Sequence, residues 1–318
     1  MTTDSSSQLP VAEVVSRAEG PYVLNTIFMG PHGIRAGWRL LMFLAIFFTI
    51  ALAAGFGLRH IPAFASWAKS QPPGTIAATF QIVTECLAIL FLFLSAWIMS
   101  KIENRTFADY GLPASGAFGK RFWQGIPFGF GSLSLLLGVI AMLHGFSFAG
   151  TESHGADAVK YGLLFGIAFI LVGIFEEFSF RGYMQATLQQ GIGFWPAAIL
   201  LSILFGAIHL QNLGEAKIGA VMAGSFGLLA AFSLQRTGNL WFPIGMHAAW
   251  DWGETYFYGV PDSGQLATGR LLNSSSHGPA WLTGGTVGPE GSVLVFAVLV
   301  LTAVAIHFAY PSRRRAAS

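Results

Sequence analysis

Residues 161–180 read YGLLFGIAFILVGIFEEFSF, and this stretch decides what kind of protein the chain is. All of its residues except Glu176 and Glu177 are uncharged. At 1.5 Å per residue, a helix of this length is about 30 Å long, which matches the hydrocarbon core of a bilayer. The stretch therefore predicts a membrane-spanning helix that carries two carboxyl groups into the membrane.

The rest of the chain has the same character. Its 318 residues include 17 Lys and Arg and 15 Asp and Glu, so 10% are charged, where soluble domains average about 25%. Hydrophobic residues make up 53%, and the mean hydropathy is +0.60. The net charge of +2 gives no basic field for nucleic acid. This composition argues against a soluble domain, a disordered chain and a nucleic-acid-binding protein, and it indicates an integral membrane protein in contact with the lipid bilayer.

The apolar runs predict the fold class, an all-α integral membrane protein with a bundle of about eight transmembrane helices. We expect a polar tail over residues 1–36, the bundle over 37–310 and a basic tail over 311–318. The runs lie near 37–58, 75–100, 124–148, 161–180, 194–211, 216–235, 239–257 and 291–310. The fifth and sixth are close enough to form a helical hairpin. A long connection over about 256–290, rich in Gly, Ser and Pro, is either a solvated linker or a lid near a site.

The distribution of Lys and Arg residues indicates how the chain is oriented in the membrane. If the N-terminus is cytoplasmic and all eight runs span, only five of the 17 Lys and Arg fall on the outer side, namely Arg59, Lys69, Lys160, Lys217 and Arg270. This bias agrees with the positive-inside rule. We therefore expect the inner or plasma membrane of the cell, with both termini in the cytoplasm.

Ionisable residues inside the apolar runs are the candidates for function, because each costs roughly 2.5–3.5 kcal/mol to insert at a helix centre. Spacing sorts them into groups on shared helix faces, since residues four apart are neighbours on a helix. Glu177 pairs with Arg181, while Glu176 points about 100° away from them. The full set is Glu176, Glu177 and Arg181, then His209, then His247 and Asp251, with Glu85 alone in the second run.

Helix lengths place these groups at one depth if one condition holds. The helix that carries Glu176 must continue through Arg181 to about Gln190. Glu176 and His209 then each lie about 21 Å from the turn shared by their helices, and they face each other across antiparallel helices. His247 and Asp251 fall in the same layer.

Two imidazoles and two carboxyl groups in a low-dielectric cavity can hydrolyse an amide bond by either of two routes. A glutamate can act as the general base that takes a proton from water, with a histidine donating to the oxyanion. Alternatively, two histidines and a carboxylate can hold a catalytic Zn²⁺ with an open position for water, the ligands coming from Glu176, His209, His247 and Asp251. The residues alone leave both routes open.

The pattern resembles a known family. Glu176-Glu177-x-x-x-Arg181, Phe205-x-x-x-His209 and His247-x-x-x-Asp251 are similar, in order, to the three motifs of the CPBP family of intramembrane proteases. That family includes the type II CAAX prenyl endopeptidases and the bacteriocin-processing or immunity proteins, also called the Abi family. The resemblance covers about residues 105–255, including FADYGL at 107–112.

The resemblance implies an intramembrane endopeptidase that cleaves a membrane-associated protein or peptide substrate. It implies that Glu176 activates water together with His209, that Glu177 and Arg181 hold the site together, and that His247 stabilises the oxyanion or binds metal. The third motif usually ends in Asn, whereas this chain has Asp251. An Asp can bind a metal or hold a proton, whereas an Asn donates without titrating.

The same polar residues are also compatible with purely structural roles. The glutamates and Arg181 could form a buried ion pair, and the histidines could make interhelical hydrogen bonds. The alternatives at the level of function are a non-catalytic membrane immunity or scaffold protein on the same fold and a proton-coupled transporter. We interpret Glu85 as a lone interhelical partner, and Asn212, which shares a helix face with His209, as structural.

Overall fold

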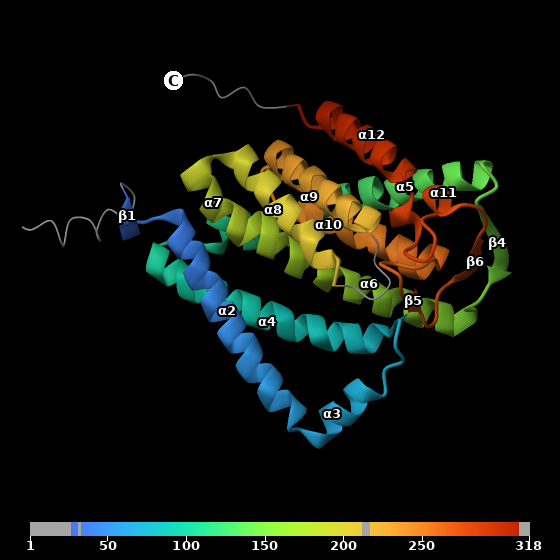
Figure 1. The fold of residues 1–318 in the computed structure, drawn as a ribbon, viewed down its shortest axis with the longest axis horizontal. Coiled ribbons are helices and arrows are strands. Elements are labelled where there is room, and N and C mark those ends of the chain that lie inside the picture. Colours follow the sequence, from blue (N-terminus) through green and yellow to red (C-terminus); the bar gives the residue numbers. More distant parts are fainter. Residues whose placement is uncertain (1–26, 31–32, 212–216, 312–318) are drawn as a thin grey trace, which may run out of the picture.

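A computed structural model describes residues 27–30, 33–211 and 217–311. Most of the predicted N-terminal tail, Asn212 and the end of the basic tail lie outside these residues. The described residues fold into a helical bundle with short strand pairs at its two ends (Figure 1). The α-helices are α2 (Ala36–Arg59), α3 (Pro62–Lys69), α4 (Ala78–Glu103), α5 (Lys120–Met142), α6 (Gly155–Glu177), α7 (Gln185–Ile192), α8 (Phe194–His209), α9 (Lys217–Thr237), α10 (Trp241–Asp251), α11 (Ala280–Thr283) and α12 (Leu294–Ala309).

The shorter elements connect these helices. Two π-helical segments, η4 (Phe178–Met184) and η5 (Trp252–Tyr258), continue α6 and α10. The 3-10 turns are η2 (Phe107–Tyr110), η3 (Ala114–Gly116) and η6 (Pro289–Gly291), and the strands are β1 (Met29–Gly30), β2 (Gly33–Ile34), β3 (Thr75–Ile76), β4 (Phe146–Thr151), β5 (Leu266–Ala267) and β6 (Leu272–Ser276).

All eight apolar runs contain a helix, which confirms the helical membrane class. Within the described residues, five helices are long and apolar enough to cross a membrane: α2, α4, α5, α9 and the continuous helix formed by α6, η4 and α7. The apolar helices α8 and α12 have 16 residues each, fewer than the about 20 residues that a simple crossing needs. The predicted count of eight transmembrane helices is therefore not confirmed.

The helix that begins at Gly155 continues to Ile192 over 38 residues, as the depth argument requires. Its π-helical segment begins directly after Glu177 and contains Arg181. A side chain at Gly182 would come within 2.9 Å of the Phe178 ring, so glycine is needed where this widened turn packs. Such π-turns occur mostly as local features near functional sites.

Glycines bring α10 into backbone contact with α5. A Cβ atom on Gly129 would lie 1.8 Å from the carbonyl oxygen of Met246, and one on Gly245 would lie 2.2 Å from that of Phe122. Small residues allow membrane helices to approach this closely. The close packing fixes the position of α10, the helix that carries His247 and Asp251. The hairpin predicted from the fifth and sixth runs is present as α8 packed against α9.

A buried polar cluster ties the other end of the bundle together. The carboxylate of Glu103 accepts hydrogen bonds from Arg39 at 3.1 Å and from the hydroxyl of Tyr183 at 2.5 Å. Arg39 also donates to Gln190 at 2.9 Å. The cluster joins α2, α4, η4 and α7, so it holds the π-helical segment from outside the site.

Strand pairing shapes the long connection after α10. β6 pairs antiparallel with β4, and β5 pairs parallel with β3, where Thr75 is opposite Leu266. These strands gather at the right of Figure 1, at the end of the bundle away from α7. Of the two interpretations of residues 256–290, a folded cover agrees with this pairing and a solvated linker does not.

Candidate active site

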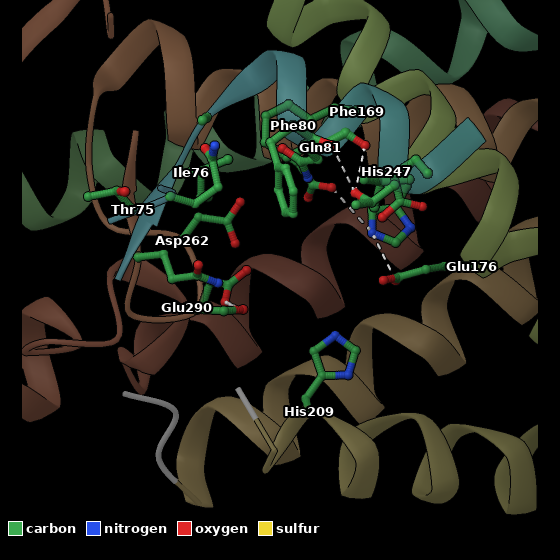
Figure 2. Close-up of a pocket in the computed structure, with 18 residues that line it drawn as sticks. Thr75, Ile76, Phe80, Gln81, Phe169, Glu176, His209, His247, Asp262 and Glu290 are labelled. Carbon is green, nitrogen blue, oxygen red and sulfur yellow. Dashed lines mark hydrogen bonds and ion pairs between the residues drawn. The ribbon is translucent and has the colours of Figure 1, made fainter. Parts of the chain in front are cut away.

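A cavity of about 390 Å³ lies between α4, α6 and α10 and is closed by the segments that contain β3 and β5 (Figure 2). Its wall carries Glu176, His209, His247 and Asp251. Sequence spacing placed these four residues in one layer, and the cavity brings them together from three helices. The other two predicted site residues, Glu177 and Arg181, do not line it.

Glu177 is the buried centre of the site. Its side chain is 0% exposed, and its Oε1 atom accepts hydrogen bonds from Arg181 Nη1 at 3.3 Å and from His247 Nδ1 at 2.8 Å. Arg181 also donates from Nε to the Gly227 carbonyl and lies 4.3 Å from the Phe205 ring centroid. A carboxylate only accepts hydrogen bonds, so Nδ1 of His247 is the donor and the other ring nitrogen is free for the cavity.

The free nitrogen of His247 faces two carboxyl groups. Its Nε2 atom lies 3.6 Å from Glu176 Oε2 and 3.5 Å from Asp251 Oδ2. Glu176 follows the helix rotation to the side opposite Glu177, and its side chain remains 24% exposed. Its Oε2 atom has no hydrogen-bond partner within the described residues. Glu176 is therefore a carboxylate that can receive a proton from a molecule in the cavity.

His209 lies on a separate wall of the cavity. It ends α8, and Figure 2 shows its ring apart from Glu176 and His247 on a different helix. Its Nδ1 atom is 2.7 Å from the carbonyl oxygen of Phe205, one turn earlier. Both His209 and Glu176 line the cavity, but the described residues give no hydrogen bond or ion pair between them.

The cavity wall also contains acidic and polar residues that sequence reasoning did not place there. Glu85, interpreted above as a lone interhelical partner, lines it together with Gln81 from the same helix face. Their i, i+4 spacing within an apolar run was an available signal. Asp262 and Glu290 come from the connection after η5, where no periodic pattern could indicate their position. Burial raises the pKa of the Asp262 carboxyl, although Thr255 donates a hydrogen bond to it at 2.7 Å.

The proposed zinc ligands do not form a ligand set. No group of three or more His, Cys, Asp and Glu residues in the described parts of the chain is arranged to hold a metal ion. His209 ends α8 with its Nδ1 atom 2.7 Å from the Phe205 carbonyl oxygen, and Figure 2 shows its ring apart from Glu176 and His247. We therefore derive no step of the chemistry from Zn²⁺.

Comparison with known proteins gives one match. Residues 158–253 match the family model described as "Type II CAAX prenyl endopeptidase Rce1-like". No curated protein matches the chain. The matched segment contains Glu176, Glu177, Arg181, His209, His247 and Asp251, and it ends before Asp262. It names the CAAX endopeptidase branch of the family and not the bacteriocin-processing or immunity branch. This segment, with its three motifs in order around one cavity, is where the chain is similar to the CAAX prenyl endopeptidase family.

Proposed function

We propose that this protein is an intramembrane endopeptidase that hydrolyses a peptide bond of a membrane-associated protein or peptide. The observation that carries the proposal is the pair formed by Glu176 and His247. A carboxylate oxygen that accepts no hydrogen bond within the described residues faces a histidine nitrogen at 3.6 Å on a cavity wall, and the other histidine nitrogen is fixed by a buried carboxylate.

In the proposed reaction, Glu176 takes a proton from water as the water oxygen attacks the scissile carbonyl carbon. His247, protonated on both ring nitrogens, donates from Nε2 to the oxygen that becomes negatively charged. Glu176 then passes its proton to the nitrogen of the leaving amine as the C–N bond breaks. The proton is thus carried from water to the amine, and the carboxylate is regenerated.

The remaining motif residues position this pair. Glu177 orients the His247 ring and offsets the positive charge on it, while the Arg181 guanidinium lies 3.3 Å from the buried Glu177 carboxylate and holds it in place. Asp251 lies 3.5 Å from the same His247 nitrogen that faces Glu176, and we assign it the same electrostatic role. His209, on the separate wall, is placed to contact the substrate or the attacking water from the other side.

We propose a glutamate mechanism in preference to a metal mechanism, because the candidate ligands do not converge. Prolonged dialysis against EDTA followed by 1,10-phenanthroline should leave cleavage within about twofold of the untreated rate. A loss of activity that added Zn²⁺ restores would contradict the glutamate mechanism.

The decisive experiment compares membranes from cells that express the wild-type protein or Glu176→Gln, with proteomic identification of new peptide termini. Glu176 Oε2 accepts no hydrogen bond in the described residues, so the substitution leaves the fold intact. We expect cleavage products that disappear in the variant and persist in Glu152→Gln, an exposed acid outside the cavity. Cleavage that continues in Glu176→Gln would remove Glu176 from the mechanism. A biological effect that survives without cleavage would favour a non-catalytic immunity or scaffold protein.

The placement in the cell is part of the same proposal. We place the protein in the inner or plasma membrane with both termini in the cytoplasm, on the distribution of Lys and Arg. The segments that contain β3 and β5, which line the cavity from one end, then lie on the side opposite the termini. Protease protection of tags at each terminus in oriented vesicles tests this placement.

A further inference from the structure

The cavity wall contains an unusual concentration of acidic residues. Five carboxyl groups line it. Three come from helices, Glu85 on α4, Glu176 on α6 and Asp251 on α10, and the connection after η5 supplies Asp262 and Glu290. These are a third of the 15 acidic residues of the chain, whereas the described lining contains none of the 17 Lys and Arg residues. A protein with a net charge of +2 has thus gathered a third of its carboxyl groups at one place.

A sixth carboxyl group lies inside the protein, next to the segment that carries Glu290. Glu254 is 0% exposed, and Trp250 donates to its Oε2 atom at 2.8 Å. Its Oε1 atom has no hydrogen-bond partner in the described residues. A Cβ atom on Gly288 would lie 3.3 Å from that oxygen, so Glu254 is adjacent to the segment that carries Glu290.

The cavity also contains acceptors without donors. The buried atoms Gln81 Oε1, Glu85 Oε2 and Glu176 Oε2 have no hydrogen-bond partner within the described residues, and all three residues line the cavity. A buried acceptor without a donor costs free energy, so these oxygens favour a ligand that brings several N–H groups. An ammonium group has three such donors and no acceptor, and a guanidinium group has five.

The acidic residues extend beyond the catalytic pair. Figure 2 shows Asp262 and Glu290 on one side of the cavity, with Glu176 and His247 on the other. The two pairs belong to one continuous lining, so a peptide whose scissile bond lies at Glu176 would bring a neighbouring side chain to Asp262 and Glu290.

We propose that the acidic end of the cavity, formed by Asp262 and Glu290, is a specificity subsite that selects substrates with a lysine or arginine side chain within a few residues of the scissile bond. The inference rests on the proposed endopeptidase function and adds the substrate class. The subsite attracts the cation electrostatically and supplies acceptors for its N–H groups.

Binding tests this subsite separately from hydrolysis. The protein carries Glu176→Gln and is reconstituted in phosphatidylcholine vesicles, whose surface has no net charge to attract a cation. The probes are three fluorescein-labelled 12-residue peptides that differ only at one central position, which is lysine, norleucine or glutamate. We expect the lysine peptide to bind at least tenfold more tightly than the norleucine peptide, and the glutamate peptide to bind more weakly still. Raising the salt from 50 to 500 mM should reduce this preference.

Variants connect the preference to the subsite. Asp262→Asn combined with Glu290→Gln should bring the lysine and norleucine peptides to within about twofold of each other. The matched control is Asp157→Asn, an exposed acid in the first turn of α6 that does not line the cavity, and it should keep the full preference. Thermal unfolding of each variant shows that it is folded.

The outcomes separate the two proposals. Equal binding of the three peptides, no binding of the lysine peptide, or a preference that survives in the double variant would overturn the subsite. Cleavage that depends on Glu176 but ignores the charge of the substrate would overturn the subsite and leave the endopeptidase intact. A lysine preference in a protein that cleaves nothing would support the cation subsite and overturn the endopeptidase.

Discussion

Replacing Glu177 with Gln tests how the site activates His247. The substitution keeps the shape of the side chain and removes its negative charge. The amide oxygen can still accept the hydrogen bond from His247 Nδ1, which is 2.8 Å long in the wild-type protein. If the His247 ring is positively charged while it stabilises the oxyanion, the missing charge acts at about 4 Å. At an effective dielectric constant of about 20 the interaction is about 4 kcal/mol. That free energy corresponds to about a 10³-fold loss in kcat.

The same substitution also affects stability, because Arg181 loses its charged partner at 3.3 Å in a buried setting. Breaking a buried ion pair from one side typically costs about 3–5 kcal/mol. Glu177→Gln should therefore lower both the rate and the Tm.

Two measurements separate these effects. The first is the single-turnover rate on a substrate whose cleavage depends on Glu176. The second is thermal unfolding in the same detergent, with assays run well below the Tm of the variant. A double variant in which Arg181 is also replaced, Arg181→Met, removes the uncompensated charge, so it should recover stability but not rate. A Glu177→Gln enzyme that retains more than a third of the wild-type rate would refute the assignment of Glu177 as the group that positions and charges His247.

Three further predictions address packing, the buried cluster and pH. Gly129→Ala should lower the Tm and abolish cleavage, because its Cβ would overlap the Met246 carbonyl at 1.8 Å, whereas Gly131→Ala, with open space around it, should do neither. Glu103→Gln should destabilise the protein by about 3–5 kcal/mol in thermal or denaturant unfolding, since it leaves a buried arginine without its charged partner, and a loss below 1 kcal/mol would contradict that role. Asp262→Asn should raise the Tm at neutral pH. Burial raises the pKa of the Asp262 carboxyl in the folded protein above its pKa in the unfolded chain, which is about 3.9. The carboxyl therefore destabilises the fold once the pH rises above the unfolded pKa. The gain in Tm should vanish when unfolding is followed below that pH, and a gain that is independent of pH would argue against this origin.

The apolar runs predicted the helices well because membrane insertion acts on local composition. A run such as 161–180 becomes a helix wherever it lies, since a bilayer leaves its backbone groups no other hydrogen-bond partners. Helical periodicity also placed Glu177 beside Arg181, because residues four apart share a face in any helix. The helix that carries Glu176 also continues past Gln190, as the count of residues required.

Tertiary structure decided what periodicity cannot encode. The hydrogen bond between Glu177 and His247 joins residues 70 positions apart, and it depends on how α6 and α10 pack. The separation of His209 from the other site residues, which argues against a zinc set, depends equally on where α8 ends. Asp262 and Glu290 reach the cavity only because β5 pairs with β3 and draws the irregular connection over the site. Sequence alone thus determined the membrane class and the polar residues within each helix, because those properties arise within single segments. The cavity, its acidic lining and the contacts of His247 arise between segments, and only the packed chain could fix them.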